Sequence, residues 1–377
     1  MTQPTNSAIV STTTSLPILA KKVKKVAASK LQKLKLLLTG ENGFSKFKKA
    51  YKLRGELGKG GFGIVYRGIR KSDNVLVAIK FIEKKNVKEW GTLDNQQVPM
   101  EIYMLSKCSN IPGVIRLLDW YSIPDGFLIV MERPYPCIDM FDFVKGQGKL
   151  SEDMAHFLFK QVAQTVQECM QNKVLHRDVK DENIVIDLKT GLTKLIDFGA
   201  ATELHNGEYF NFQGTIMCSP PEWLLNRLYL GEEATVWSLG VLLYTALNER
   251  LPFQTVEKIC SPHSVDSLRF FAPLSKECED LIRWCLKFEP EQRCTMEEIL
   301  EHSWVQQEPM EWKEFTKKMV QNAIDNDSPA KSNEPRPMLK SPKKTHKNEE
   351  STSSSQQSLY ARRRGNKEHL TLKICKT

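Results

Sequence analysis

The sequence predicts a fold of the α+β class in which antiparallel strands come first. Two runs of β-branched and aromatic residues, at 64–69 and 75–81, are joined by a Lys-Ser-Asp-Asn turn, and a glycine-rich turn precedes the first run. This order predicts strand, glycine turn, strand, hairpin and strand. A helical segment at 98–105 and an apolar, strand-like run at 127–131 follow. Strands and helices are therefore both expected early in the chain.

Composition restricts the class of protein. The chain has 377 residues, and 41% of them are hydrophobic, which is enough for a large core. The net charge of +9 fits nucleic acid, a membrane surface or neither as a partner. Nine cysteines without a C-x-x-C pair argue against zinc and disulfides and indicate reduced thiols in the cytoplasm or the nucleus. No run approaches 18 apolar residues, so no membrane span is expected.

The two ends of the chain differ from the middle. Residues 1–44 are basic and are expected to form a flexible arm or a surface helix. A transit peptide is less favoured, because no arginine precedes Arg54. Residues 309–377 are rich in Ser and Lys and are expected to be a largely disordered tail. Its cluster Arg362–Arg364 is either a solvated patch or a nuclear-localisation signal. Nucleic-acid binding is not expected, because aromatics are not interleaved with these charges.

The glycine-rich turn contains the first candidate site. Gly58, Gly60 and Gly63 fit G-x-G-x-x-G, a spacing that dinucleotide-binding folds share. In those folds a helix follows the last glycine, whereas here a strand follows, which favours a loop folded over a triphosphate. Lys80 ends the run Val-Ala-Ile-Lys, where its ammonium could reach the phosphates. Glu101, central in the segment 98–105, could pair with Lys80.

The strongest motif lies further along the chain. Residues 176–183 read H-R-D-x-x-x-x-N, with Asp178 and Asn183, and D-F-G follows at Asp197. Together with the glycine loop, V-A-I-K, the helix Glu and a later P-P-E, the order resembles the protein kinase family over residues 45–308. The resemblance implies a bilobal fold with ATP between the lobes. The small antiparallel β lobe would span 45–131, the hinge 132–137 and the mostly helical lobe 138–308.

The resemblance also implies a role for each motif residue in phosphoryl transfer. Asn183 and Asp197 would hold Mg²⁺, and Asp178 would accept or orient the proton of the substrate hydroxyl. Lys180 would meet the transferred phosphate, and Thr215 would tie the substrate loop to Asp178, as in serine/threonine kinases. Glu222 of the P-P-E motif would form a buried, structural ion pair with Arg293 in the helical lobe. The residues implied to contact ATP are Leu57, Gly58, Gly60, Gly63, Val65, Ala78, Lys80, Met131, Glu132, Pro134 and Asp139.

The hinge points to one kinase family in particular. Met131 would be the gatekeeper, and the carbonyl of Glu132 would accept from the adenine amino group. Pro134 has no N–H, so one hydrogen bond to ATP is lost, worth about 0.5–1.5 kcal/mol. The stretch 131–143 resembles the hinge of the Pim family of serine/threonine kinases, as does the Val at position 236, where most kinases have Asp.

Two expectations about activity follow. Between Asp197 and Glu222 the hydroxyl residues lie near D-F-G or in the substrate loop, except Tyr209, so activity without activation-loop phosphorylation is expected. Four acids shared with Pim kinases would receive basic residues N-terminal to the target Ser or Thr: Asp139, Asp142, Asp181 and Glu182. Each alone could equally be an ordinary solvated acid.

A pseudokinase-type scaffold is the alternative function. Against it, the residues needed for catalysis are intact: Lys80, Glu101, Asp178, Asn183 and Asp197. The expected protein is a monomer that acts on protein substrates with basic motifs and uses ATP and Mg²⁺.

Overall fold

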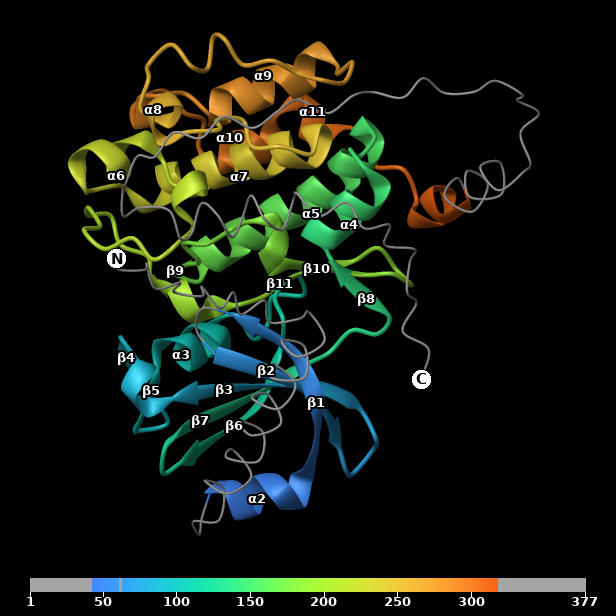
Figure 1. Ribbon diagram of the computed structural model, residues 1–377, viewed down its shortest axis with the longest axis vertical. Coiled ribbons are helices and arrows are strands. Elements are labelled where there is room, and N and C mark those ends of the chain that lie inside the picture. The colour runs from blue at the N-terminus through green and yellow to red at the C-terminus, as the bar shows by residue number, and fades with distance from the viewer. Residues whose placement is uncertain (1–42, 61–62, 318–377) are drawn as a thin grey trace, which may run out of the picture. The chain divides into compact units, whose positions relative to one another are not determined.

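The computed structural model describes residues 43–60 and 63–317 (Figure 1). The predicted basic arm up to residue 42, the tip of the glycine turn and the tail from residue 318 lie outside the described residues. The described chain forms two compact units. The residues up to Val87 together with Asp119–Val130 form the first, and Lys88–Leu118 with the residues from Met131 onward form the second.

The first unit is built on a five-stranded sheet in the order β1-β2-β3-β7-β6. Its strands are β1 (Tyr51–Gly60), β2 (Gly63–Arg70), β3 (Leu76–Glu83), β6 (Leu117–Ile123) and β7 (Gly126–Glu132). β2 pairs antiparallel with both β1 and β3, so the predicted order of strand, glycine turn, strand, hairpin and strand is confirmed. Helix α2 (Gly43–Ala50) precedes the sheet and buries Phe44 and Phe47.

The second unit begins with a hairpin that the sequence did not reveal. Strands β4 (Trp90–Leu93) and β5 (Gln96–Pro99) pair antiparallel, and helix α3 (Met100–Lys107) follows directly. The helix was expected from residue 98, but Val98 and Pro99 pair with β4 instead. Tyr103 and Lys107 of α3 both contact Glu203, which also belongs to the second unit.

The rest of the second unit is mostly helical (Figure 1). Helix α7 is buried almost all round, including Val236 and Trp237, as expected of a central core helix. Helix α5 starts at the capping residue Ser151, and α9 at Ser275. The helices are α4 (Met140–Gln147), α5 (Glu152–Gln171), α6 (Pro221–Asn226), α7 (Gly231–Asn248), α8 (Val256–Ile259), α9 (Lys276–Cys285), α10 (Met296–Glu301) and α11 (Ser303–Gln306).

Short antiparallel strands position the segments that carry the catalytic motifs. β10 (Ile184–Asp187) pairs with β8 (Cys137–Asp139) and with β11 (Thr193–Leu195). β9 (Val174–Leu175) pairs with β12 (Thr202–Glu203). The H-R-D segment therefore begins at the end of β9, and D-F-G follows the end of β11. Short helices of three residues complete these segments: η2 (Asp181–Asn183), η3 (Phe198–Ala200) and η4 (Ile216–Cys218).

The packed chain extends past residue 308, where the tail was expected to begin. Residues 312–317 are helical, and Trp312 and Phe315 are buried. Trp312 donates its indole N–H to the Leu188 carbonyl at 3.1 Å and stacks on Phe157. Gly191 has a φ of +75°, and a Cβ there would meet the Trp312 ring at 2.5 Å. None of the helices within residues 43–60 and 63–317 is long and apolar enough to span a membrane.

Candidate active site

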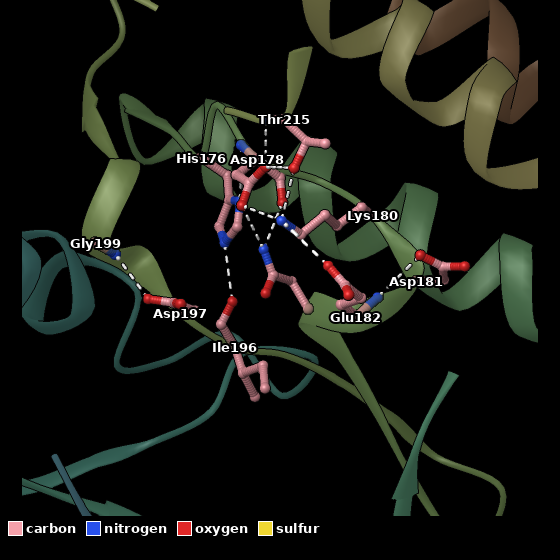
Figure 2. A network of polar contacts seen from close by, with 10 residues as sticks. His176, Asp178, Lys180, Asp181, Glu182, Ile196, Asp197, Gly199 and Thr215 are labelled. Carbon is pink, nitrogen blue, oxygen red and sulfur yellow. Dashed lines mark hydrogen bonds and ion pairs between the residues drawn. The ribbon is translucent and has the colours of Figure 1, made fainter. Parts of the chain in front are cut away.

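The H-R-D loop is held in place by a buried histidine. The Nε2 of His176 lies 3.1 Å from the Ile196 carbonyl and donates to it, so Nδ1 accepts from the Asp178 N–H at 3.3 Å. Burial lowers the pKa of His176, which favours the neutral ring that both bonds require. The ring also meets Phe198 edge-on at 4.8 Å. His176 therefore links the H-R-D loop to the D-F-G segment (Figure 2).

Three of the predicted site residues converge on the carboxylate of a fourth, Asp178 (Figure 2). Its Oδ2 accepts from Asn183 Nδ2 at 2.9 Å and lies 2.9 Å from Lys180 Nζ. Its Oδ1 accepts from the Thr215 N–H at 3.1 Å. Lys180 also donates to the Thr215 hydroxyl at 2.8 Å. The substrate loop, the cation and the proposed base are thus brought together.

Lys180 carries a positive charge in this cluster. Its burial alone would lower the pKa of the ammonium, but the Asp178 and Glu182 carboxylates outweigh that effect and the net pKa is raised. Glu182 Oε2 lies 3.5 Å from the same Nζ. A cation that stays charged and lies beside Asp178 suits the developing charge of a transferred phosphoryl group.

The two predicted metal ligands, Asn183 and Asp197, lie on segments that are joined by a main-chain hydrogen bond. Asn183 uses its side-chain N–H₂ to donate to the Asp178 carbonyl at 2.8 Å and to the Asp178 carboxylate, so its amide oxygen is the atom that would bind a metal ion. The Ile196 N–H donates to the Asn183 carbonyl at 2.9 Å, which keeps Asp197 near this residue. Asp197 has a φ of +61°, a strained backbone of the kind found at functional sites.

This donor set fits Mg²⁺. Magnesium prefers oxygen ligands and is commonly held by one or two side chains while phosphates and waters complete its shell. One carboxylate and one amide oxygen match that description. No group of three or more His, Cys, Asp or Glu that could hold a metal occurs within the described ranges. In sites of this kind, phosphate oxygens and waters supply the other ligands.

The predicted phosphate loop lies on β1 and β2 of the first unit. Gly63 faces Gly60 across the turn, and a Cβ at Gly63 would meet the Phe81 carbonyl oxygen at 2.5 Å, so only glycine fits. Val65 is paired with Lys80 in the sheet register, and Lys80 is buried. Leu57 and Gly58 lie on β1 and Ala78 on β3. Gly61 and Phe62 lie outside the described residues.

The predicted pair of Lys80 and Glu101 spans both units. Lys80 belongs to the first unit, and Glu101 lies on α3 of the second, where it is buried. Their pairing stays a prediction.

The hinge residues follow the end of β7. Met131 is buried, and Glu132 is the last residue of the strand. The Glu132 N–H donates to the Arg116 carbonyl at 3.0 Å. Pro134 follows, and the Tyr135–Pro136 peptide bond is cis. The predicted hinge therefore leads through two prolines into β8 and α4.

The four predicted substrate-binding acids differ in their surroundings. Asp139 caps α4 by accepting from the Asp142 N–H at 2.8 Å. Burial raises the pKa of Asp139 to about 6, and the charges of Asp142, Asp181 and Glu182 add to the rise. Asp142 is exposed, whereas Asp181 is only 3% exposed. In this structure a basic side chain could therefore reach Asp142 directly, while Asp181 contributes its charge from below the surface.

Sequence reasoning missed one contact set that holds the segment after D-F-G. Arg177, whose side chain is 4% exposed, lies 3.5 Å from Glu89. It also donates to the Ala200 carbonyl at 2.6 Å and to the Asn211 carbonyl at 3.1 Å. Gln213 donates to the same Glu89 oxygen at 3.2 Å. Arg177 is visible in the H-R-D motif, but nothing in the sequence marks Glu89 as its partner.

A second ion pair was expected and is confirmed. Arg293 donates two bonds to Glu222, at 2.9 Å and 2.7 Å, and both residues are buried. This pair joins the P-P-E segment to the loop before α10.

Comparison with known proteins finds similarity to protein kinases along most of the chain. A family model described as the protein kinase domain matches residues 51–305. Serine/threonine-protein kinase prk-2 of Caenorhabditis elegans is 64% identical over 308 residues, which cover 81% of this chain and 70% of the relative. Serine/threonine-protein kinase pim-2 of Danio rerio is 40% identical over 292 residues, with 75% and 93% covered. The PAS domain-containing serine/threonine-protein kinase of Mus musculus is 36% identical over 259 residues, which cover 67% of this chain but only 18% of the relative.

Proposed function

The chain belongs to the protein kinase family as a Pim-like serine/threonine kinase, and from this premise we propose that it prefers substrates with basic residues before the target Ser or Thr and needs no activation-loop phosphorylation. The family implies ATP and Mg²⁺ as cofactors and proteins as substrates. The observation that carries the chemistry is the convergence of Lys180, Asn183 and Thr215 on the Asp178 carboxylate.

The proposed chemistry divides among these residues. Mg²⁺, when bound with ATP, would neutralise phosphate charge, and Asn183 and Asp197 are the residues that would hold it. Asp178 would accept or orient the proton of the substrate hydroxyl. Lys180 would place its positive charge beside the transferred group, because it is anchored to both Asp178 and Thr215. Thr215 would hold the substrate loop at the distance that this transfer requires.

The preference for basic substrates is supported by the charge of the acidic group. Asp139, Asp142, Asp181 and Glu182 are close enough for their charges to raise the pKa of Asp139 together. Glu182 is balanced by Lys180, but the described contacts include no cation beside Asp139 or Asp142. An arginine or lysine of a substrate would supply that charge.

Independence from activation-loop phosphorylation is supported by the contacts of Arg177. A phosphate would act by giving a cation in this region a negative partner. Glu89 already lies beside the Arg177 guanidinium, and two carbonyls accept its other N–H groups. Between the residues that carry these two carbonyls, Glu203 lies 3.2 Å from Lys107. The unmodified chain therefore supplies the charges that hold this segment.

The oligomeric state and the location complete the proposal. A monomer is proposed from the family resemblance, and a location in the cytoplasm or nucleus from reduced thiols. None of the eight cysteines within the described ranges is part of a disulfide.

A positional-scanning peptide assay tests the proposal. Phosphatase-treated protein with Mg-ATP is expected to phosphorylate Ser/Thr peptides and to select Arg or Lys several residues before the target. The reason is that the described contacts include no cation beside Asp139 or Asp142. Absence of selection at those positions would contradict the substrate preference, and inactivity that an upstream kinase restores would contradict the independence from phosphorylation.

Two control arms locate the selection. Charge reversal at Asp139 and Asp142, to Lys, should raise KM for the best basic peptide by about tenfold or more, the size expected for charged hydrogen bonds. The selection should also weaken at a pH of about 5.5 relative to about 7.5, on either side of the Asp139 titration. The pKa of Asp139 is raised to about 6, so its negative charge is present above that pH and is lost as pH falls through it. An unchanged KM after charge reversal, together with equal selection for basic residues at the two pH values, would contradict this assignment.

Glu89→Gln should lower activity even though Glu89 lies outside all kinase motifs. The substitution removes the charge that lies 3.5 Å from the buried Arg177 guanidinium, so kcat with a basic peptide should fall by about tenfold, which corresponds to about 1.4 kcal/mol. Steady-state kinetics on phosphatase-treated protein check this, with the exposed Glu297→Gln on α10 as the matched control. Equal kcat values for Glu89→Gln and wild type would remove the support that Arg177 gives to the proposal.

A further inference from the structure

Lys194 makes two contacts that none of the kinase motifs explains. It lies on β11, three residues before Asp197. Its Nζ is 2.8 Å from Glu132 Oε1 and donates to the Pro112 carbonyl at 2.6 Å. The Lys194 and Glu132 side chains are each 20% exposed, so the pair is partly shielded and costs more to break than an exposed ion pair.

Glu132 is bound to the same neighbouring segment through its main chain. The Glu132 N–H donates to the Arg116 carbonyl at 3.0 Å, and the Arg116 N–H donates to Glu132 Oε1 at 2.9 Å. The Arg116 guanidinium is 3.9 Å from the other carboxylate oxygen and is 62% exposed, so it adds little. The carboxylate of Glu132 is therefore held mainly by one main-chain N–H and by Lys194.

The segment 112–116 also lies along β11. The Leu195 N–H donates to the Gly113 carbonyl at 2.7 Å, and the Ile115 N–H donates to the Leu195 carbonyl at 3.0 Å. The Ile196 N–H continues to the Asn183 carbonyl. A continuous set of hydrogen bonds thus connects the hinge residue Glu132 with the strand that leads into Asp197.

We propose that Lys194 is a positioning residue for the nucleotide: it fixes Glu132 so that the Glu132 carbonyl faces the adenine amino group, in register with the metal-binding residue Asp197. This inference rests on the proposed function as an ATP-dependent kinase and on the contact implied by the Pim resemblance, in which that carbonyl accepts from the adenine amino group. Pro134 has removed the neighbouring hinge N–H, so the bond to the Glu132 carbonyl is the remaining polar contact of adenine with this part of the hinge. Where one hydrogen bond instead of two positions the adenine, binding depends more strongly on the orientation of the carbonyl that accepts it.

The test compares ATP with purine riboside triphosphate, which lacks the 6-amino group. Binding of each nucleotide with Mg²⁺ is measured by calorimetry for wild type, Lys194→Met, Lys194→Arg and the exposed control Lys189→Met. Wild type should bind ATP about twofold to tenfold more tightly than the analogue, the value of one net hydrogen bond. Lys194→Met should bring this ratio near one. Lys194→Arg should restore part of it, and Lys189→Met should match wild type.

The outcomes separate this inference from the proposed function. If wild type binds both nucleotides equally, the Glu132 carbonyl does not read the amino group, and the proposed hinge contact fails together with this inference. If wild type binds ATP more tightly than the analogue and Lys194→Met shows the same ratio of affinities, only the role of Lys194 is overturned. A general loss of folding would lower affinity for both nucleotides and leave the ratio unchanged. Should Lys194→Met not fold, Glu132→Gln replaces it, because it removes the same ion pair and must show the same loss of discrimination.

Discussion

The Asp197→Asn variant is expected to lose at least about a thousandfold in kcat, the upper end of what removing one preorganised stabiliser costs. Asp197 is the carboxylate of the proposed metal site, and an amide in its place loses the charge that balances Mg²⁺. Asparagine has the same size as aspartate. Its amide oxygen can still accept from the Gly199 N–H, which lies 3.3 Å from Asp197 Oδ1. The loss should therefore appear in kcat with a basic peptide, while the melting temperature stays close to wild type.

The matched control is Asp266→Asn, which removes an exposed carboxylate in the same unit. It should keep wild-type kcat. Two outcomes would contradict this expectation. Asp197→Asn that retains activity would disprove the metal role of Asp197. A wild-type protein no more active than Asp197→Asn would favour the alternative of a scaffold with an intact set of motifs.

Arg293→Met is expected to destabilise the protein by about 3–5 kcal/mol, as removal of one partner of a buried ion pair does. The guanidinium makes a two-pronged contact with Glu222 and also donates to the carbonyls of Lys287, Phe288 and Glu233. Methionine fills much of the same space but donates nothing, so a buried carboxylate and three carbonyls lose their partner. Thermal unfolding should show a fall in Tm of roughly 10 °C.

Two further variants establish the cause of that loss. Arg250→Met removes an exposed arginine that lies over the Phe271 ring at 4.0 Å, and it should change Tm by only a few degrees. The double variant Glu222→Gln with Arg293→Met should be less destabilised than the sum of the single variants, because it leaves no unpaired buried charge. A Tm for Arg293→Met within the range of the Arg250→Met control would show that the pair contributes little to stability.

Local motifs alone account for much of the fold and chemistry of this protein. The order of strand, glycine turn, strand, hairpin and strand follows from residue types within a few positions of each other, and the sheet register repeats it. The cluster of Asp178, Lys180 and Asn183 lies within six consecutive residues, so its chemistry could be recognised from spacing. The pair of Glu222 with Arg293 could be predicted only because the family resemblance supplied the partner.

Tertiary packing accounts for the rest. The helix expected from residue 98 starts at Met100, because Val98 and Pro99 pair with β4, and pairing overrides local helical preference. Burial of Asp181 depends on the elements packed over it. Trp312 lies against Gly191 and Phe157 although the composition after residue 308 suggests a tail.

The contacts of Glu89 with Arg177 and of Lys194 with Glu132 bring together residues far apart in the chain. An isolated glutamate or lysine carries no local signal of its partner, because the strength of an ion pair depends on distance and burial, which only the folded chain sets. The order and spacing of the motifs were therefore sufficient to identify the family and to predict which residues take part in the reaction. The residues that hold those reacting groups in place could be identified only from the folded chain.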